Sequence, residues 1–369
     1  MISVVNQYIL GFDLGGNTDF IKKSELNEFT LIEAAGNILP TFELEFNTDD
    51  EKILPKLNEL SELKVILGAD RDSAFDIPLS ISSFTQVENG RKSVALNIKG
   101  FYNALDYITK PVLKITKKVS GVEAIKEVVS NDFKPDFNVE KSSDKQNWIQ
   151  YNISNKKFVA DTILHSFNKD SFFLSAITVE GTFRLRDVKK DLDRDYDYRL
   201  IMQPKKQNDI VYDNNPTVVS NTGFLNNWMG YGREVFEQNL EEGKINKFVE
   251  QPEPILALTK KLARTETVRY GGTNVLNENV HKNYWKAYWN NLSNIVSLGN
   301  IDIIVTIDDY FYPIHPLDLI MLNMPSKEAN YSSEYLSGLY YVSKVSRTWS
   351  NSKFSTTLVL NRESINQIS

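Results

Sequence analysis

The stretch of this sequence that looks most like a catalytic motif is YILGFDLGGNTDF, residues 8–20. An apolar run ends at Asp13, and Gly15, Gly16 and Thr18 follow it. A strand that ends in Asp-x-Gly-Gly-x-Thr can form a phosphate-binding turn, because glycine lets backbone N–H groups come close to a phosphate. One hypothesis is therefore a nucleotide-dependent phosphotransferase that uses the Gly15-Gly16 loop.

The rest of the chain does not supply the other parts that this chemistry needs. A phosphate turn of the actin-like type requires a second Asp-Gly turn on a sheet whose strands alternate with helices. The segment after Gly16 is too short for a helix, and the only later Asp pair, Asp308-Asp309, is followed by Tyr-Phe-Tyr. Short glycine motifs often match by chance. The pattern therefore favours a strand and a hairpin turn, and it predicts no cofactor.

The titratable residues do not form a recognisable metal site or catalytic set. His165, His281 and His315 are scattered, without the spacing of zinc ligands, and we expect His165 to be a packing or surface residue of a helix. The acidic run DVKKDLDRDYDYR (187–199) could suggest calcium, but it lacks the glycine and the downstream glutamate of a calcium loop. A solvated linker between domains is favoured, with calcium as the minor alternative. We predict no catalytic and no metal-binding residues.

An aromatic stripe marks one helix near the end of the chain. The segment NYWKAYWNNLSNIV places aromatic and aliphatic side chains on one side, where they could stack on a sugar or a base. Aromatic residues at helical spacing usually belong to a core or an interdomain contact, which we favour. A protein that binds a glycan through Trp285 and Trp289 is the alternative. The stripe consists of Tyr284, Trp285, Tyr288, Trp289, Leu292 and Ile295.

Length and composition indicate a globular chain of several domains. The 369 residues suit two to four domains, with 41% hydrophobic and 24% charged residues. The net charge of −6 argues against tight nucleic-acid binding, which needs a basic stripe. The absence of cysteine excludes disulfides and thiol chemistry and fits assembly in a reducing cytoplasm. No signal peptide is visible, and no run approaches the ~18 apolar residues of a membrane span.

Residues 1–110 are predicted to form a β-barrel. In IPLSISSFTQVENGRKSVALNIKGF (77–101), apolar and polar residues alternate on both sides of Asn89-Gly90, a strong hairpin signal. The alternation slips between Ile81 and Phe84, which predicts a β-bulge near Ser82-Ser83.

Residues 111–198 are predicted to form a small α+β domain. Ser120 and Glu123 have the spacing of a capping box before a helix whose apolar face includes Val122 and Ile125. A second helix is expected in SNKKFVADTILHSF. A hairpin that turns at Glu180-Gly181 follows it.

The remaining residues predict a second β-barrel with an insertion. Residues 199–225 and 299–369 contain further strands, among them a long hairpin over 338–363. Residues 226–298 are polar and mixed, and we expect an inserted α/β domain there. The predicted fold class is α+β, mainly β, with two similar antiparallel β-barrels and inserted small α/β domains.

The order of these segments resembles the baseplate hub family of contractile-tailed phages, whose hub module also occurs in type VI secretion spike proteins and contractile injection systems. The most specific part is the end of the chain. It contains, in order, a strand that starts with Pro-x-Asp, the pattern Gly-x-Tyr-x-Val-x-x-Val, an alternating strand and a final arginine. The usual Pro-Gly-Asp is Pro316-Leu317-Asp318 here. The signature positions, with the hairpin pair, are Asn89, Gly90, Pro316, Asp318, Gly338, Tyr340, Val342, Val345, Leu358 and Arg362.

The resemblance implies a structural role. Hub proteins of this family form a homotrimer whose two barrels per chain make a pseudo-sixfold ring, which adapts the hexameric tail tube to the threefold central spike. Such a ring would sit in the virion baseplate, with tape-measure and wedge proteins as further contacts. DNA would pass through its channel without specific binding, which the acidic net charge fits. No enzymatic activity is expected. The alternative within the same kind of machine is a tail-tip component that binds a receptor or glycan through Trp285 and Trp289.

Overall fold

The computed structural model describes most of the chain. The described residues are 8–16, 21, 25–49, 57, 62–68, 74–89, 93–202, 209–213, 216–220, 232–251, 256, 268–276, 279–308, 313–324, 333, 335–350 and 353–364.

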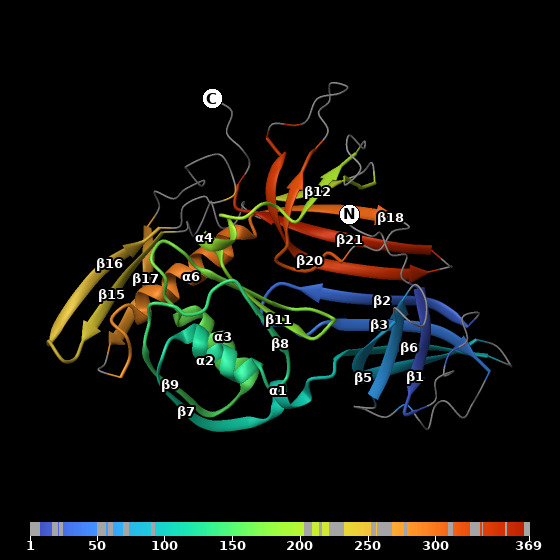
Figure 1. The fold of residues 1–369 in the computed structure, drawn as a ribbon, viewed down its shortest axis with the longest axis horizontal. Coiled ribbons are helices and arrows are strands. Elements are labelled where there is room, and N and C mark those ends of the chain that lie inside the picture. Colours follow the sequence, from blue (N-terminus) through green and yellow to red (C-terminus); the bar gives the residue numbers. More distant parts are fainter. Residues whose placement is uncertain are drawn as a thin grey trace.

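One sheet of thirteen strands dominates the molecule (Figure 1). Three of its strands, β14 (Thr217–Ser220), β18 (Ile301–Asp308) and β21 (Lys353–Arg362), lie off the main path. The other ten, in spatial order, are β1 (Tyr8–Leu14), β4 (Glu62–Gly68), β5 (Phe75–Asn89), β6 (Ser93–Tyr102), β3 (Thr41–Thr48), β2 (Leu26–Ala34), β20 (Gly338–Ser350), β19 (Leu319–Leu322), β12 (Tyr198–Ile201) and β13 (Ile210–Val211).

The long strand β20 joins the two predicted β modules. Its C-terminal half pairs with β2 of the first module, from Ala34 opposite Lys344 to Glu28 opposite Ser350. Its N-terminal half pairs with β19, and its other edge pairs with β21. The strands predicted for two barrels are therefore continuous through one sheet.

The mainly β character of the prediction is confirmed, whereas the two closed barrels are not. Among the described residues no sheet closes on itself, since β1 and β13 end the main path of the large sheet. Each module nevertheless has its own apolar cluster. Phe29, Leu44 and Ile98 belong to the first, and Ile303, Tyr340 and Leu358 belong to the second.

The β5–β6 hairpin follows the sequence closely. The register shifts between Ile81 and Ser83, which confirms the predicted bulge. The hairpin extends to the pair Asn89 and Ser93, so Asn89 is the last residue of β5. Gly90 lies outside the described residues.

The opening stretch is a strand and a turn. Strand β1 pairs antiparallel with β4 at the end of the sheet. Gly15 and Gly16 follow with φ of +60° and +87°, which glycine adopts without strain. The N–H of Gly16 donates to Oδ1 of Asp13 at 2.8 Å, so this carboxylate closes the turn on its own backbone. The strand-and-turn interpretation is supported, but the predicted hairpin is wrong, because among the described residues β1 pairs with β4 and not with the next strand, β2.

The middle domain has an apolar core of its own. Helix α2 (Gly121–Val129) begins with the predicted capping box of Ser120 and Glu123. The predicted turn at Gly181 is also present, with φ of +72°. The other elements are α1 (Leu105–Thr109), β7 (Pro111–Val119), β8 (Lys134–Phe137), β9 (Gln146–Ser154), α3 (Asn155–His165), β10 (Phe173–Ile177), β11 (Thr182–Asp187) and α4 (Val188–Asp191).

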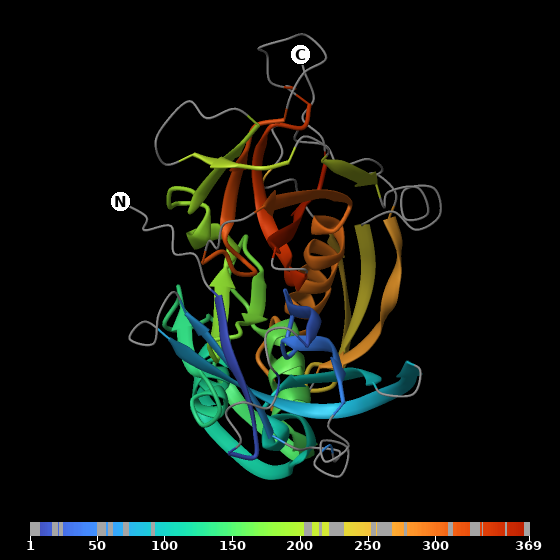
Figure 2. The same cartoon turned by 90° about the vertical axis from the view of Figure 1, so that its right-hand side faces the viewer.

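The described residues of the insertion form a sheet and a helix. Strands β16 (Lys244–Glu250), β15 (Gly232–Asn239) and β17 (Val268–Leu276) pair in that order, and α6 (Tyr284–Leu298) packs on them. Figure 2 shows α6 between this sheet and the rest of the molecule. The helix is the one that the aromatic stripe predicted, and it serves as an interdomain contact.

Candidate functional site

Four of the signature side chains form the core of the second β module. Tyr340, Val342, Val345 and Leu358 have no solvent exposure and belong to one apolar cluster. The register places Val345 directly opposite Leu358 on the neighbouring strand. Because cross-strand pairs on a buried face fix the register of a sheet, this part of the signature specifies how β20 and β21 pair.

Arg362 encloses one end of that core. Its guanidinium carbon lies 4.5 Å from the centre of the Tyr340 ring, in cation–π contact. Its Nε donates to the carbonyl of Ser364 at 2.7 Å, and Nη2 donates to that of Tyr335 at 2.9 Å. The two signature residues are therefore direct neighbours, and burial lowers the pKa of Arg362 below its ordinary value.

The Pro316-Leu317-Asp318 turn explains why glycine is usual at its centre. Leu317 has φ of +72°, a left-handed conformation that costs a residue with a Cβ about 1–2 kcal/mol. Its side chain is buried with Leu319 and Tyr341, so apolar packing offsets the strain. Gly338 also has a positive φ, +139°, at the start of β20.

Asp318 connects this turn to the middle domain. Its Oδ1 accepts from Nη1 of Arg184 at 2.6 Å, and its Oδ2 accepts from the N–H of His315 at 2.8 Å. The same Arg184 nitrogen donates to the carbonyl of Pro316 at 3.1 Å. Burial disfavours the charged guanidinium, but Asp318 outweighs this and the pKa of Arg184 lies above its ordinary value.

Glu33 lies fully buried on β2, beside Asp318 and His315. It pairs with Nη1 of Arg347 on β20 and accepts from the N–H of Val179 at 3.0 Å. Nδ1 of His315 lies 2.9 Å from its Oε1 and must donate, because a carboxylate only accepts. Burial alone would raise the pKa of Glu33, but His315 and Arg347 lower it to about 2.

We call this cluster the ionic junction; it comprises Glu33, Arg184, His315, Asp318 and Arg347. Its members come from β2, β11, β20 and the turn before β19, which belong to both β modules and the middle domain. Buried charges are tolerated only when they are paired and hydrogen-bonded. The junction therefore fixes the relative position of all three units.

Further ion pairs lie near the ionic junction and involve residues of β8, β11 and α4. Arg186 pairs with Asp136 at 2.5 Å, and Arg194 pairs with Asp191 at 2.7 Å. Asp191 is only 1% exposed and also accepts from the hydroxyl of Tyr341 at 3.1 Å.

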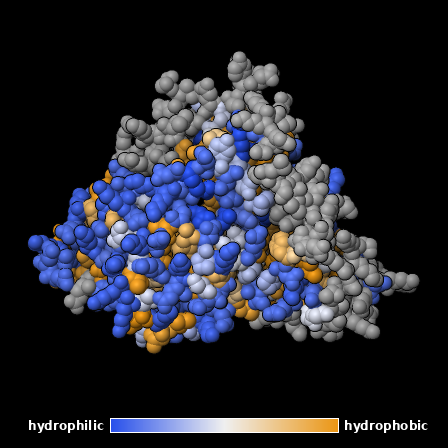
Figure 3. Space-filling model, viewed as in Figure 1, coloured by the Kyte–Doolittle hydropathy of each residue, from blue (hydrophilic) through white to orange (hydrophobic). Residues whose placement is uncertain are grey.

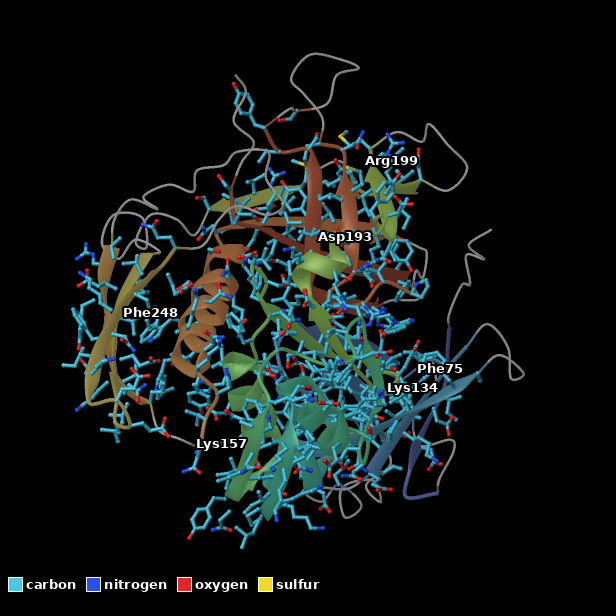
Figure 4. All side chains as sticks on the ribbon, turned by 60° about the vertical axis from the view of Figure 1, so that its left-hand side comes forward. Phe75, Lys134, Lys157, Asp193, Arg199 and Phe248 are labelled. Carbon is cyan, nitrogen blue, oxygen red and sulfur yellow. The ribbon has the colours of Figure 1, made fainter. Side chains whose placement is uncertain are left out.

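The predicted solvated linker over 187–199 is therefore wrong for its first half. Asp187 and Asp191 are buried because their carboxylates have partners in the folded chain, Ser171 and Arg194 among them. Asp193 and Asp195 are exposed as predicted, and Figure 4 shows Asp193 beside α4. No group of three or more potential metal ligands exists within the described part of the chain, so calcium gains no support.

A second junction joins α3 to α6 without charges. His165 is 3% exposed and stacks on Tyr284 with ring centres 3.6 Å apart, which confirms it as a packing residue. Asn291 donates to the carbonyls of Ile163, Leu164 and Ser166 at 2.8–3.1 Å. We call this the helix junction.

His281 belongs to the helix junction in a defined tautomer. Its Nε2 donates to the carbonyl of His165 at 3.0 Å, and its Nδ1 accepts from the N–H of Asn283 at 3.2 Å. A proton on Nδ1 would remove that acceptor. Burial lowers the pKa of both His165 and His281 below the ordinary value of 6.5.

Sequence reasoning found the signature core but missed most of the ionic junction. Glu33 continues the buried alternation of Phe29 and Leu31 on β2, and Arg347 lies between the buried Val345 and Trp349 on β20. A charged residue on the buried face of a strand was the available signal.

Between β6 and β18 the large sheet also presents a largely polar face, opposite the face that carries both apolar clusters, and Ile32, Ile304 and Val359 are among the apolar residues on it. The hydroxyls of Thr30 and Thr348 lie 3.1 Å apart on it, across the boundary between the modules. Lys99 pairs with Glu43 at 3.0 Å. In cross-strand register from β6 to β18 the face includes Asn97, Lys99, Glu43, Glu45, Glu28, Thr30, Thr348, Ser346, Lys344, Ser355, Thr357, Thr306 and Asp302.

Solved structures of tail proteins share this fold. A tail protein from Neisseria meningitidis superposes with a TM-score of 0.60 at 11% identity, over 98% of this chain and 96% of that one. The 43 kDa tail protein of prophage MuSo2 from Shewanella oneidensis gives 0.62 at 8% identity, over 97% and 98% of the two chains. The resemblance inferred from the sequence is confirmed as a likeness of fold.

A component of the E. coli type VI secretion system also matches. It gives a TM-score of 0.50 at 8% identity, over 96% of this chain and 76% of that one, and is described as structurally similar to the bacteriophage T4 tail proteins gp27 and gp5. No protein-family model matches the chain, and comparison of its sequence with curated proteins finds no match. In the described residues, no helix has the length and apolarity to cross a membrane.

Proposed function

We propose that this protein is the structural hub of a phage tail baseplate. Three copies would form a ring of two β modules each, which adapts a sixfold tail tube to a threefold central spike. The role would be structural and not enzymatic. The signature residues would then shape this ring, with Tyr340, Val342, Val345 and Leu358 as its core.

The observation that carries the proposal is the largely polar face of the large sheet between β6 and β18. The two apolar clusters of the β modules lie on the other side of the sheet there. Leu319 and Tyr341 on β19 and β20 are covered by a further apolar cluster, so the face that would line a passage stops short of them. Three copies of a two-module sheet would give six modules around the passage. The fold shared with tail proteins supports the same role.

The chemistry of this face fits the passage of DNA without retention. Of the thirteen polar residues of this face, seven carry a hydroxyl or an amide, four carry a carboxylate and two are lysines, and none is an arginine. Lys99 is neutralised by Glu43. Tight phosphate binding requires several unpaired basic groups, so a polyanion would move past such a wall without being held.

The proposed assembly divides the chain into four units. They are a first β-barrel module (1–110), a small α+β domain (111–198), a second β-barrel module (199–225 with 299–369) and the inserted domain (226–298). In a ring, the neighbouring copies would supply the strands that close the open sheets. Spike, tube, tape-measure and wedge proteins would be the partners, and the virion baseplate the location.

The contacts of Trp285, Trp289 and Asp13 give no support to the two alternatives, glycan binding and phosphate transfer. Trp285 donates to the carbonyl of Val275 at 2.8 Å, and Trp289 packs beside Gly272, so both are engaged with β17. Asp13 is engaged by Gly16, and β1 is an antiparallel strand at the end of the sheet. Glycan binding and phosphate binding would each need these groups to be free.

Light scattering coupled to size exclusion tests the proposal. A trimer of the 42.3 kDa chain has a mass of about 127 kDa, and negative-stain images should show a threefold ring with a central opening. Addition of the spike protein from the same tail operon should give a larger complex. A protein that stays monomeric at all concentrations, with and without the spike protein, would refute the hub.

A further inference from the structure

The β7–β9 ribbon turns an apolar face to solvent. Leu113, Ile115, Ile149 and Tyr151 are 73%, 52%, 53% and 75% exposed. The register pairs Leu113 with Tyr151 and Ile115 with Ile149, so the four side chains form one patch across both strands. Figure 3 shows hydrophobic residues along the lower edge of the molecule, where β7 and β9 run in Figure 1. A patch of this kind marks an interaction surface.

The charges of this ribbon are of one sign. Residues 111–119 and 146–154 contain three lysines and neither Asp nor Glu. Lys114 pairs with Glu127 at 2.6 Å, on the side of the domain. Lys117 and Lys118 are exposed, and no carboxylate in the described part of the chain pairs with them. The apolar patch therefore has a positive end, which suits an acidic partner.

The open edges of the ribbon favour a protein over a lipid surface. No further strand pairs with β7 or β9 in the part of the chain that the structure describes. Both outer edges thus carry backbone N–H and C=O groups that need partners. Lipid tails cannot supply hydrogen bonds, whereas a protein strand or polar side chains can.

A second copy of this chain carries a surface with the required properties. Residues 1–110 hold 17 acidic and 10 basic residues, a net charge of −7, so the acidity of the chain is concentrated in the first β module. Residues 82–87 of β5 are all exposed, with Phe84 at 40% and Val87 at 56%. Strand β4 pairs with β5 only as far as Ser80. Phe84 and Val87 lie on opposite faces of β5, since they pair with Ile98 and Ala95. Among the described residues, this part of β5 thus offers an exposed apolar side chain on each face beside an open strand edge, within a module that is acidic as a whole.

The two surfaces lie at different ends of one copy. In Figure 1, β5 and β6 are at the right and β7 and β9 at the lower left. A contact between them therefore joins two copies through unlike surfaces. A closed ring of three needs such a head-to-tail contact, because a contact between identical surfaces would close at two.

We propose that the β7–β9 face binds the first β module of the neighbouring copy, with Leu113, Ile115, Ile149 and Tyr151 against the exposed part of β5. Lys117 and Lys118 face carboxylates of that module. This contact rests on the proposed trimer and names the surface that closes it.

Zero-length cross-linking locates the contact. Unlabelled and ¹⁵N-labelled protein are mixed, treated with a carbodiimide that joins lysine to carboxylate, and analysed by peptide mass spectrometry. Mixed-isotope peptides that link Lys117 or Lys118 to a carboxylate of residues 1–110 are expected. Mixed-isotope links from these lysines only to residues beyond 110, or none in a sample that is oligomeric, would overturn the contact.

Variants test the energy of the contact. The double variant Leu113→Ser with Tyr151→Ser should weaken self-association at least tenfold, and Lys117→Glu with Lys118→Glu should also weaken it. All four side chains are exposed, so the unfolding temperature of the dissociated chain, measured at high dilution, should not change. The matched control is Ile245→Ser with Tyr270→Ser on β16 and β17, where the exposures are 69% and 65%. It should leave association unchanged.

The outcomes separate the two proposals. If the wild type is a trimer and the β7–β9 variants keep its mass and affinity, this contact is refuted and the hub proposal stands. The same holds if only the control variant weakens association. A wild type that never associates would refute the hub, and the contact with it. Loss of association in the β7–β9 variants alone supports the contact.

Discussion

The ionic junction and the helix junction hold units of the same chain together by opposite means. The ionic junction uses buried charges, with Glu33 between Arg347 and His315. The helix junction uses neutral groups, with His165 stacked on Tyr284 and Asn291 donating to three carbonyls. The first depends on the Glu33 carboxylate being ionised, as its lowered pKa indicates, and the second on its histidines being neutral.

The difference shows where each contact can fail. A buried ion pair contributes little net stability, but the loss of one partner leaves a bare charge and is very costly. A neutral hydrogen-bonded contact loses only the bonds that are removed. The ionic junction should therefore be the more sensitive to substitution and the helix junction the more sensitive to mild acid.

The largest effect is expected when Glu33 loses its guanidinium. Arg347→Met should lower the free energy of unfolding by about 3–5 kcal/mol, because the Glu33 carboxylate stays buried without that partner. The double variant Glu33→Leu with Arg347→Met should recover much of this loss. Urea unfolding measures both. The control Lys99→Met removes a surface partner of Glu43 and should cost no more than about 1 kcal/mol. A single variant no worse than that control would contradict the assignment.

Strong acid should weaken the ionic junction next. The pKa of Glu33 is about 2 in the folded chain against an ordinary 4.5. The stability this provides is complete above pH 4.5 and is lost as the pH falls toward 2, up to about 3 kcal/mol. Urea unfolding at a series of pH values should show this slope in the wild type. In Glu33→Gln the slope should be shallower, and an equal slope would rule out Glu33 as its source.

The helix junction should respond less to substitution. Asn291→Leu removes the donor to three carbonyls and the acceptor of the Phe173 N–H, at a cost of about 2 kcal/mol. Val296→Ala, at an exposed position of the same helix, should stay within about 0.5 kcal/mol. Thermal unfolding compares the two. Equal effects would mean that the amide contacts of Asn291 do not hold α6.

The smallest effect is expected from mild acid at the helix junction. Since burial lowers the pKa of His165 and His281, the unfolded chain binds protons before the folded chain does. The stability of this junction is therefore complete above pH 6.5 and falls as the pH drops below it. Hydrogen exchange of α6 amides should accelerate between pH 7 and 5.5 after correction for the intrinsic rate. The His281→Gln variant should lose part of this dependence, and amides of β20 should not show it.

The local elements of the fold were predictable because their signals lie within a few residues. Ser120 and Glu123 predicted the start of a helix, and the break in alternation after Ile81 predicted a bulge. Both signals depend only on residues a few positions apart in the chain. The same holds for the turn at Gly181. The signature core was predictable too, because Val345 and Leu358 alternate in one hairpin.

The burial of the charged residues could not be predicted from the sequence, because it depends on partners that only the folded chain brings together. Asp191 looks like a solvated residue in an acidic run, yet Arg194 and Tyr341 bury it.

The sequence by itself determined the mainly β class, the capped helices, the hairpins and the residues of the C-terminal core. Only the tertiary structure decided that the two β modules share one sheet through β20, and that Glu33, Arg184 and Arg347 meet inside it. The reason is the separation along the chain between the residues that interact. Alternation and capping are properties of neighbouring residues, whereas Glu33 and Arg347 are 314 positions apart in the sequence. A buried charge can be recognised as stable only when its distant partner is in place.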